Sequence, residues 1–538
     1  MKVREVHVRN THRSLRERVL LAGDRQLGAG NFFWRSYRRL CRKDQPLFYT
    51  DGDRVFTARD LARQVAALMT FYRSEGVERG SHVGLRCTDG VTGFVHHVAI
   101  TSLGAVAVHC NPTMPRSQAE AYFTAAAARR VFAEDEGEGW SPLERLRVSP
   151  PLLDEVPDPR FPSNHVIMIS HSSGTTGTPK TPLFTHGGFF RGKRGRLLTF
   201  PQNRTTRLLT GLPHSHSAGL SYMSTALLTG TPLYVHNRQS PITIEAAISE
   251  FRPTGVLSFP STFGDLDPWD IDAEAREGLR FWNGMGDASH AGHIRRLLRA
   301  CPNAVYIDGL GSSEMGMVLF QTVKDRDTTA TRIVGKPAPV VRDAAVFDDG
   351  GRRLPKGAPG RLGVLTPSST PGYFANPEMT RQSQAGSYFL TGDIAQELED
   401  GRWRHLDRVS DVIASPQGDL YSTLMEELVH EAIDVQDSAV VGIHDRDGSL
   451  QPVVFAVPRE TSRLSAVEGH TRITERINVA AEPGTDSPRA VVLFEGIEHF
   501  PRGVTGKALK RVLRDEFASC LKTRDVSSTP GVFDAYYT

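Results

Sequence analysis

The sequence predicts an α/β fold with more than one domain. The chain has 538 residues. This is too long for a single hydrophobic core of ordinary size, so two or more domains are expected. Short apolar strand patterns alternate with helical patterns over residues 52–135, and this alternation returns from His165 to about Asp308. Between Gly335 and Arg408, turn dipeptides separate short strand candidates, which is typical of antiparallel hairpins.

The first alternating segment divides into individual elements. The spacing of apolar residues and the positions of turn residues indicate where each helix and strand begins and ends. We expect a helix over 56–75 capped by Thr57, a strand over 82–87, a helix over 90–102, a strand over 105–110 closed by Asn111 and Pro112, and a later strand over 165–169. Alternation of this kind implies a largely parallel sheet with helices on both faces.

Composition excludes several classes of protein. Hydrophobic residues make up 39% and charged residues 23%, so the chain is neither disordered nor fibrous. The net charge of +3 gives no electrostatic argument for binding nucleic acid or a membrane surface. The five cysteines are far apart in sequence, which argues against a disulfide framework or a Cys-rich zinc site and fits a cytoplasmic protein.

The sequence also bears on membrane and targeting segments. No stretch approaches the roughly eighteen apolar residues that span a bilayer. Residues 1–23 are rich in arginine, and their longest apolar run, residues 19–22, is too short for the core of a signal peptide. We expect this segment to be an arm that lies on the body of the protein.

The strongest local motif is rich in glycine, serine and threonine and follows the strand at 165–169. Its glycines let the backbone approach a ligand closely, while its hydroxyl and N–H groups can bind phosphate oxygens. The spacing of a Walker-type loop is absent, and such a segment on its own is typical of a flexible loop. The candidate phosphate-binding residues are Ser172, Ser173, Gly174, Thr175, Thr176, Gly177 and the positively charged Lys180.

Four more segments follow in order, at 213–219, 311–314, 388–393 and 501–507. Together with the first motif they resemble the AMP-forming adenylating enzymes, which include acyl- and aryl-CoA synthetases, peptide-synthetase adenylation domains and luciferases. The resemblance covers about residues 80 to 510. It implies a large N-terminal domain of mixed sheets and helices over 1–407, a hinge near Ser410, a small mobile α/β lid over 408–521 and a loose tail over 522–538.

The resemblance also implies roles for individual residues. Lys507 would stabilise charge on the α-phosphate of ATP and on the attacking oxygen. Glu314 would bind Mg²⁺ together with Thr175, beside Thr176. Asp393 would bind the ribose hydroxyls, and Arg408 the ribose or a phosphate. Further nucleotide-contacting positions are Gly286, Asp287, Leu310, Gly311 and Ser313. Each of these residues on its own is typical of a turn or a surface. Their roles are therefore assigned from the order of the motifs along the chain.

The position of the acid substrate follows from the same resemblance. His216 matches the family position beside the acid, and His214 is an additional histidine near it. Trp282, Met285 and Met315 lie where relatives line the acyl pocket, so their bulk favours a small acid. The alternative is that both histidines are structural, beside a helix that starts at Ser217, and that the bulky residues belong to the core. No further ligand at helical spacing supports a zinc site here.

The sequence departs from the family pattern at several positions. Leu310 replaces the aromatic residue that packs on adenine, and Thr181 replaces a glycine. In the loop after the hinge, Ser410 and Ala414 replace charged residues, Pro416 stiffens the chain, and Gly418 is displaced by about one residue. CoA synthetases pass the pantetheine thiol beside this glycine, so thioester formation with CoA stays open. Adenylation is still expected, because it does not depend on this loop.

Three functions remain open. The first is a ligase that adenylates a small acid, releases pyrophosphate and transfers the acid to CoA. The second keeps adenylation but uses an amine acceptor, as an amide synthetase does, or as an enzyme that activates nitrite with AMP to diazotise an aromatic amine. The third is a non-catalytic nucleotide-binding protein, which the presence of Lys507 and Glu314 disfavours. We expect a stand-alone monomer or homodimer that uses ATP and Mg²⁺ and binds neither nucleic acid nor membrane.

Overall fold

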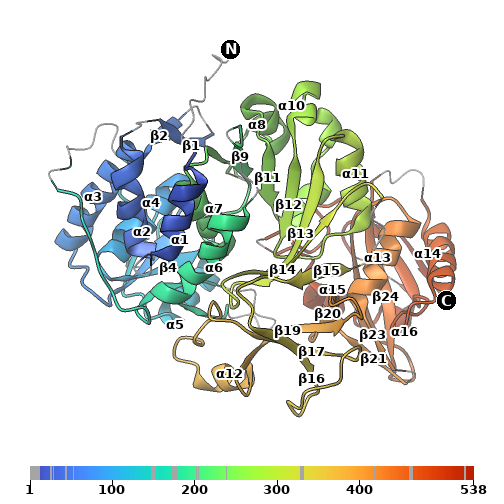
Figure 1. The fold of residues 1–538 in the computed structure, drawn as a ribbon. Coiled ribbons are helices and arrows are strands. Elements are labelled where there is room, and N and C mark those ends of the chain that lie inside the picture. Colours follow the sequence, from blue (N-terminus) through green and yellow to red (C-terminus); the bar gives the residue numbers. More distant parts are fainter. Residues whose placement is uncertain are drawn as a thin grey trace.

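The structure, a computed structural model, describes most of the chain. The described residues are 12–24, 27, 29–42, 45–51, 54–137, 139–146, 153, 155–171, 179–200, 203, 205–237, 239–327, 332–416, 418–459, 464–503, 505–525 and 529–538, with only the backbone described at 29, 30 and 199. In Figure 1 the N-terminal elements lie at the left, the strands of a large sheet in the middle and the C-terminal elements at the right. The predicted α/β class is confirmed.

The first alternating segment forms a sheet that has six strands within the described residues. Their order is β6, β5, β3, β4, β7, β8, and every neighbouring pair except β7–β8 is parallel. The strands are β3 (His82–Arg86), β4 (Val106–Cys110), β5 (Arg130–Ala133), β6 (Trp140–Pro142), β7 (Val166–Ile169) and β8 (Leu183–Thr185). This arrangement confirms the expected strands over 82–87, 105–110 and 165–169.

Helices accompany this sheet as predicted. They are α2 (Ala29–Leu40), α3 (Ala58–Ser74), α4 (Gly90–Ser102), α5 (Arg116–Ala125), α6 (His186–Thr199) and α7 (Ser217–Thr229). The predicted cap of α3 is confirmed, because Thr57 and Asp60 form a reciprocal capping box. Removing such a cap typically costs about 1 kcal/mol of stability.

The large sheet has fourteen strands in the described part of the chain, in two portions. Strands β1, β10, β9, β11, β12 and β13 are parallel, whereas β14 to β20 pair in antiparallel fashion, as the turn dipeptides predict. The strands are β1 (Pro46–Thr50), β2 (Arg54–Thr57), β9 (Leu208–Thr210), β10 (Leu233–Val235), β11 (Gly255–Ser258), β12 (Phe281–Met285), β13 (Val305–Ser312), β14 (Met317–Lys324), β15 (Ile333–Pro337), β16 (Asp343–Phe347), β17 (Pro359–Leu365), β18 (Gln384–Ala385), β19 (Tyr388–Glu397) and β20 (Trp403–Arg408).

Further helices lie along this part of the chain. They are α8 (Ile244–Phe251), α9 (Pro260–Asp265), the 3₁₀ turn η1 (Pro268–Asp270), α10 (Ala273–Gly278), α11 (Ala291–Ala300) and α12 (Pro377–Gln382). Helix α11 buries Ile294, Leu297 and Leu298 and exposes Arg299, so its apolar stripe follows helical spacing.

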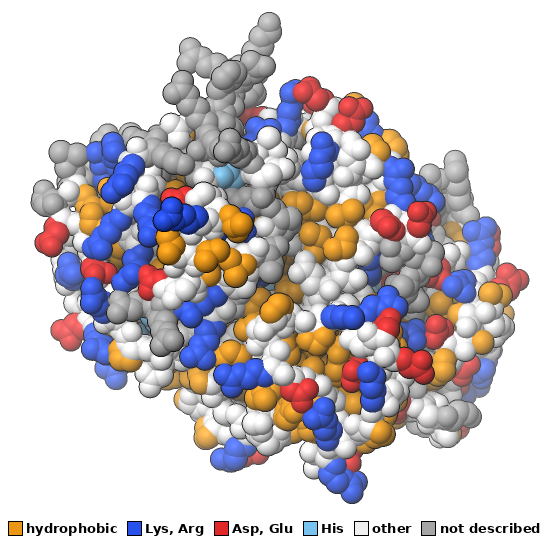
Figure 2. Space-filling model, in the orientation of Figure 1, with side chains coloured by type: hydrophobic (Ala, Val, Ile, Leu, Met, Phe, Trp, Pro, Cys, Tyr) orange, Lys and Arg blue, Asp and Glu red, His pale blue; other side chains and the backbone are white. Residues whose placement is uncertain are grey.

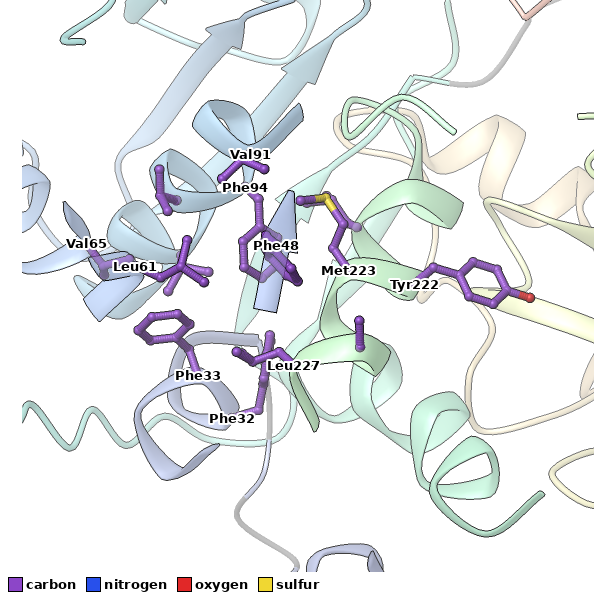
Figure 3. Packing of buried hydrophobic residues seen from close by; sticks show 14 of the residues in the cluster. Phe32, Phe33, Phe48, Leu61, Val65, Val91, Phe94, Tyr222, Met223 and Leu227 are labelled. Carbon is purple, nitrogen blue, oxygen red and sulfur yellow. The ribbon is translucent and has the colours of Figure 1, made fainter. Parts of the chain in front are cut away.

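The main hydrophobic core joins the two sheets. Phe32 and Phe33 of α2, Phe94 of α4 and Met223 of α7 pack in it together with Phe48 of β1 (Figure 3). Burying a side chain of this size contributes about 1.5–3 kcal/mol relative to leaving it exposed. The core therefore fixes α7, whose first turn carries the candidate substrate residues.

The C-terminal elements form a smaller α/β unit after β20 ends at Arg408. Ser410, the predicted hinge, is exposed in the turn between β20 and β21. The elements are β21 (Ile413–Ser415), β22 (Gly418–Leu420), α13 (Ser422–Ala432), β23 (Val435–His444), β24 (Leu450–Pro458), α14 (Ala466–Ala480), β25 (Ala490–Phe494), α15 (Lys510–Glu516), α16 (Cys520–Thr523) and β26 (Val532–Tyr537). A domain boundary at 407 and a mobile lid stay predictions.

The prediction of a loose tail over 522–538 is wrong for its last residues. Strand β26 pairs with β25 in antiparallel fashion and extends the lid sheet. The carboxylate of Asp534 accepts a hydrogen bond of 2.6 Å from the backbone N–H of Ala466, at the start of α14. The apolar side chains of β26, such as Ala535 and Tyr537, pack on the lid core and hold the segment in place.

The described part of the predicted N-terminal arm, residues 12–23, lies on the body, whereas residues 1–11 lie outside the described residues. Helix α1 (Leu15–Gly23) packs beside α6, and Arg18 donates hydrogen bonds to the carbonyl oxygens of Leu197 and Phe200. Acidic and basic side chains are mixed over the face that Figure 2 shows, in keeping with the small net charge. Among the helices of the described residues, none has the length and apolar character required to cross a bilayer.

Candidate active site

The loop that carries Lys507 is held against the large sheet by an ionic clamp. Arg502 donates to Asp437 of the lid at 2.8 Å and, through Nη1, to Asp265 at the end of α9 at 2.9 Å. Ser261 Oγ donates to the carbonyl oxygen of Thr505 at 3.1 Å. These contacts between lid and large domain fix where Lys507 lies.

Lys507 faces the residues that follow β12. Its Nζ lies 3.5 Å from Oδ1 of Asp287, and both side chains are about one-third exposed. Gly286 has a φ of +86°, a backbone conformation that glycine adopts without strain, and this turn ends β12 and presents Asp287. The structure therefore brings Lys507, Gly286 and Asp287 together.

His216 stands beside this group at the start of α7. Burial, followed by the charges of His171 and Lys507, lowers the pKa of His216 to about 3, so the ring is neutral at physiological pH. Its Nδ1 accepts a hydrogen bond of 3.2 Å from the backbone N–H of Ala218, which places the ring proton on Nε2. The ring packs edge-on against Phe259 at 5.2 Å. His216 is thus a fixed, uncharged hydrogen-bond donor.

Asp393 is a buried carboxylate on β19, paired in register with Arg408 of β20. Its Oδ1 accepts hydrogen bonds from Arg408 Nη1 at 2.8 Å and from His405 Nε2 at 3.2 Å. Burial alone would raise the pKa of Asp393, but Arg408 and His405 hold it well below its usual range. Its Oδ2 is buried and has no hydrogen-bond partner among the described residues, which suits a hydroxyl donor such as a ribose.

Replacing Asp393 with alanine should weaken ATP binding. The variant removes the predicted acceptor for the ribose hydroxyls and the carboxylate that pairs with Arg408, which we expect to raise the Kd for ATP by about ten- to hundredfold. Equilibrium binding of ATP to the two proteins measures this. Asp400→Ala in the exposed turn before β20 is the matched control. An unchanged Kd in the Asp393 variant would remove this carboxylate from the nucleotide site.

Glu314 lies near Lys180 and Tyr373. The Tyr373 hydroxyl donates to Glu314 Oε1 at 3.5 Å, and the Lys180 ammonium lies 5.9 Å from the centre of the Tyr373 ring. A carboxylate oxygen is a ligand that Mg²⁺ accepts, so Glu314 fits the predicted metal role. The other predicted phosphate and metal residues, Ser172, Ser173, Gly174, Thr175, Thr176 and Gly177, lie outside the described residues.

The remaining nucleotide candidates differ in their surroundings. Ser217 Oγ donates to Ser313 Oγ at 3.2 Å, so Ser313 joins the first turn of α7. Gly311 approaches β14 so closely that a Cβ there would lie 2.5 Å from the carbonyl oxygen of Met317. Leu310 packs against the core of the antiparallel strands.

The three bulky pocket candidates lie in different cores. Met285 shares a core with Phe259, whose ring contacts His216. Trp282 is three residues away on the same strand and therefore points to the opposite face, where it packs on Phe263. Met315 is buried in the core of the antiparallel strands. Of the three, only Met285 belongs to the same core as Phe259.

His214 packs in a group of buried histidines. Sequence analysis named His214 but did not identify the group. Its ring lies 6.0 Å from that of His109, and His109 Nε2 lies 3.0 Å from His97 Nδ1. Burial lowers the pKa of His214 to about 4. A Cβ on Gly93 of α4 would clash with the His214 ring, so this histidine packs against α4. The structure favours a packing role for His214.

Sequence analysis also missed residues whose position depends on distant contacts. Tyr373 follows Gly372 in the sequence, and sequence analysis assigned it no role. Arg502 lies five residues before Lys507 and could be suspected only from that proximity. Phe259 follows β11 and carries no polar signal. Only folding brings these three residues to the site.

A second histidine group joins the lid to the large domain. The ring of His430 on α13 stacks on His290 at 4.1 Å and meets His293 edge-on at 4.7 Å. Glu427 accepts hydrogen bonds from the backbone N–H of Ala291 at 2.7 Å and from His290 Nδ1 at 3.1 Å. Burial, then neighbouring positive charge, lowers the pKa of His293 to about 3 and that of His430 well below its usual value.

Acid should therefore destabilise this contact. An unfolded histidine binds a proton from about pH 6.5 downward, whereas His293 in the folded protein binds one only near pH 3. Between about pH 6.5 and pH 3, protonation therefore favours the unfolded or undocked chain. The contribution of these histidines to the free energy of unfolding is complete above pH 6.5 and decreases as the pH falls. His430→Leu should flatten the dependence of the melting temperature on pH, and His444→Leu on an exposed lid position should not. Identical pH profiles for all three proteins would contradict this.

Comparisons with known proteins show the family to which the chain belongs. A sequence profile of the family described as AMP-binding enzyme matches residues 34–374. A 3-aminoavenalumate diazotase of Streptomyces sp is 32% identical, and the match covers 94% of this chain and 99% of the diazotase. A 3-hydroxybenzoate–CoA ligase of Aromatoleum sp. (strain CIB) is 25% identical, and the match covers 88% of this chain and 93% of the ligase. The anthranilate CoA ligase AuaEII, solved in complex with anthranoyl-AMP, superposes with a TM-score of 0.79 at 19% identity over 91% of this chain and 97% of that one. The chain belongs to the AMP-binding enzyme family and is an AMP-forming ligase.

Proposed function

We propose that the acid adenylated by this ligase is nitrite and that the acceptor is the amino group of an aromatic amine. The observation that carries the proposal is the match with the diazotase, which extends over nearly all of both chains and exceeds that with the CoA ligase. The loop after the hinge supports it. Ile413 and Leu420 close this loop as the hairpin β21–β22, with Ala414 exposed where the family has a lysine.

The proposed reaction proceeds in balanced steps. A nitrite oxygen attacks the α-phosphorus of ATP, the bond to the β-phosphate oxygen breaks, and pyrophosphate leaves. The amine nitrogen then attacks the nitrosyl nitrogen, AMP leaves, and one amine proton passes to solvent, which gives an N-nitrosamine. Its tautomer, a diazohydroxide, takes up a proton and loses water to give the diazonium ion. No oxidant or reductant is required.

Individual residues would serve the first step by position and charge. Lys507 would stabilise the attacking oxygen and the α-phosphate, where negative charge accumulates. Asp393 would bind the ribose, and Glu314 would hold Mg²⁺ that neutralises the phosphates. His216 would donate its Nε2 proton in a hydrogen bond to the acid. Residues 172–180 would bind the leaving pyrophosphate, and movement of the lid about Ser410 would admit the acceptor.

A second candidate is transfer of a carboxylic acid to CoA, which the match with the CoA ligase supports. Pyrophosphate release distinguishes the two. We would measure it with Mg²⁺-ATP and either nitrite, benzoate, cinnamate or a short aliphatic acid, each alone, with CoA and with an aromatic amine. The proposal predicts release with nitrite that an amine accelerates and CoA does not. Release with a carboxylate that CoA accelerates would replace the proposal with the second candidate.

A further inference from the structure

Buried polar atoms without a partner gather near His216. Three of them are His171 Nε2, Ser215 Oγ and His109 Nδ1, and none has a hydrogen-bond partner among the described residues. His171 is 4% exposed, Ser215 is 1% exposed, and His109 is fully buried. Leaving a buried polar group unpaired costs free energy, so several such groups in one place favour a site where a polar ligand binds.

These side chains come from segments that meet at one edge of the six-stranded sheet. His109 lies on β4 and His171 comes just after β7, and these two strands are parallel neighbours whose carboxyl ends share that edge. Ser215 directly precedes His216, which caps α7. The charge of His171 acts on both His109 and His216, whose pKa values burial lowers first and this charge lowers further. His171 is therefore close to His216 and also directly precedes Ser172, the first candidate phosphate-binding residue.

The other histidines of this group are held by α4. A Cβ on Gly93 would lie 2.1 Å from His214 Nε2, so this ring nitrogen faces the helix. His109 Nε2 pairs at 3.0 Å with a buried histidine of the same helix. These contacts give His109 and His214 a packing role, and they leave His171 and Ser215 as the candidate ligand-binding side chains.

His171 is an uncharged side chain that can donate a hydrogen bond. Burial lowers its pKa to about 4, so the ring is neutral at physiological pH. A neutral imidazole carries its one proton on either nitrogen, so the unpartnered Nε2 of His171 can be the donor. The Ser215 hydroxyl is a donor as well, and His216 has its proton on Nε2. Together the three side chains offer three neutral donors.

We propose that His171 and Ser215 bind the acid together with His216, and that these three donors select nitrite over carboxylic acids. The inference rests on the proposed function. Nitrite has three acceptor atoms, namely two oxygens and a nitrogen with a lone pair, so it can pair with all three donors. Each nitrite oxygen has more than one lone pair, which leaves one for the attack on the α-phosphorus.

A carboxylate cannot satisfy the same three donors. It has two acceptor oxygens, and its carbon carries hydrogen or a hydrocarbon group where nitrite has the lone pair on nitrogen. One buried donor would then face this carbon and stay unpaired. A site built to hydrogen-bond one group rejects an analogue that lacks it, because the buried polar atoms of the site lose their partner.

The test compares nitrite with acetate as the acid in Mg²⁺-ATP-dependent pyrophosphate release. His171→Phe keeps a ring of similar shape and removes both nitrogens. We expect the KM for nitrite to rise by about ten- to hundredfold in this variant, the preference for nitrite over acetate in kcat/KM to shrink, and the Kd for ATP to stay near wild type. His171→Gln keeps an N–H donor and should restore part of the effect, and Ser215→Ala should shrink the same preference. His165→Phe, just before the other end of β7, is the matched control.

Two outcomes would overturn the inference. An unchanged KM for nitrite in His171→Phe would show that this ring does not contact the acid. Equal losses with nitrite and acetate, without any recovery in His171→Gln, would show that the ring only supports the fold of the site. Melting temperatures identify a variant that fails to fold, and His171→Gln and Ser215→Ala carry the test if His171→Phe does so.

A binding measurement separates this inference from the proposed function, which fails if wild type releases no pyrophosphate with nitrite. Azide is a small anion with nitrogen acceptors, and its infrared stretching band shifts when it accepts hydrogen bonds. Azide bound to wild type should show a shifted band that returns toward the position in water in His171→Phe. The absence of bound azide in wild type, or the same band in both proteins, would contradict the role of His171.

Discussion

Replacing Lys507 with alanine should lower the rate of pyrophosphate release by about 10²–10³ and leave ATP binding largely intact. The ammonium group faces Asp287 and His216 in a loop that Arg502 fixes against the large domain. It is placed to act on charge that develops when the acid attacks the α-phosphate. We do not expect binding of the ground state to require it, because Asp393 and the residues at 172–180 are proposed to hold the nucleotide.

Single-turnover pyrophosphate release and equilibrium ATP binding separate these two effects. Lys522→Ala is the matched control, since that lysine is also on the lid and is exposed. Release near the wild-type rate in the Lys507 variant would contradict its role. A parallel loss of ATP affinity would mean instead that Lys507 binds the nucleotide in the ground state.

Replacing Glu314 with glutamine should lower adenylation by about a hundredfold and raise the Mg²⁺ concentration needed for half-maximal rate. The substitution keeps the shape of the side chain and removes the negative charge that Mg²⁺ prefers in a ligand. Glu314 is almost fully buried beside Tyr373, so bulk solvent does not replace the lost charge easily.

Titration of pyrophosphate release with Mg²⁺ measures this effect, with Glu378→Gln at an exposed position of α12 as the control. A lower maximal rate with an unchanged Mg²⁺ dependence would place Glu314 in the structure of the site without a contact to the metal. An unchanged rate and Mg²⁺ dependence would remove it from the site altogether.

Local sequence patterns were sufficient for much of the fold. The α3 helix with its Thr57 cap, α4 over Gly90–Ser102 and the antiparallel hairpins before Arg408 follow from apolar period, capping and turn residues. The last strand, β26, was not predicted. Its polar surroundings resemble a tail, and β26 is stabilised by pairing with β25, which lies about forty residues earlier, and by packing on the core of the C-terminal unit.

The site shows the limits of sequence analysis more sharply. Lys507 and Asp393 were assigned only through their family pattern, because a lone lysine or a turn aspartate carries no chemical signal. Trp282 and Met285 were grouped by position in the chain, although three residues on a strand separate opposite faces. The clamp formed by Arg502 and the stack of His290 on His430 depend on lid docking, which no local pattern encodes.

The most direct test of the proposed chemistry follows the nitrogen atom of nitrite. Wild-type protein would be incubated with ¹⁵N-nitrite, Mg²⁺-ATP and 3-aminocinnamate, with and without CoA, and the products trapped and analysed by mass spectrometry. Diazotisation predicts that ¹⁵N enters the trapped diazonium product in an ATP-dependent manner, with one AMP released per product and no effect of CoA. An aminocinnamoyl-CoA thioester, with no ¹⁵N incorporated, would contradict it.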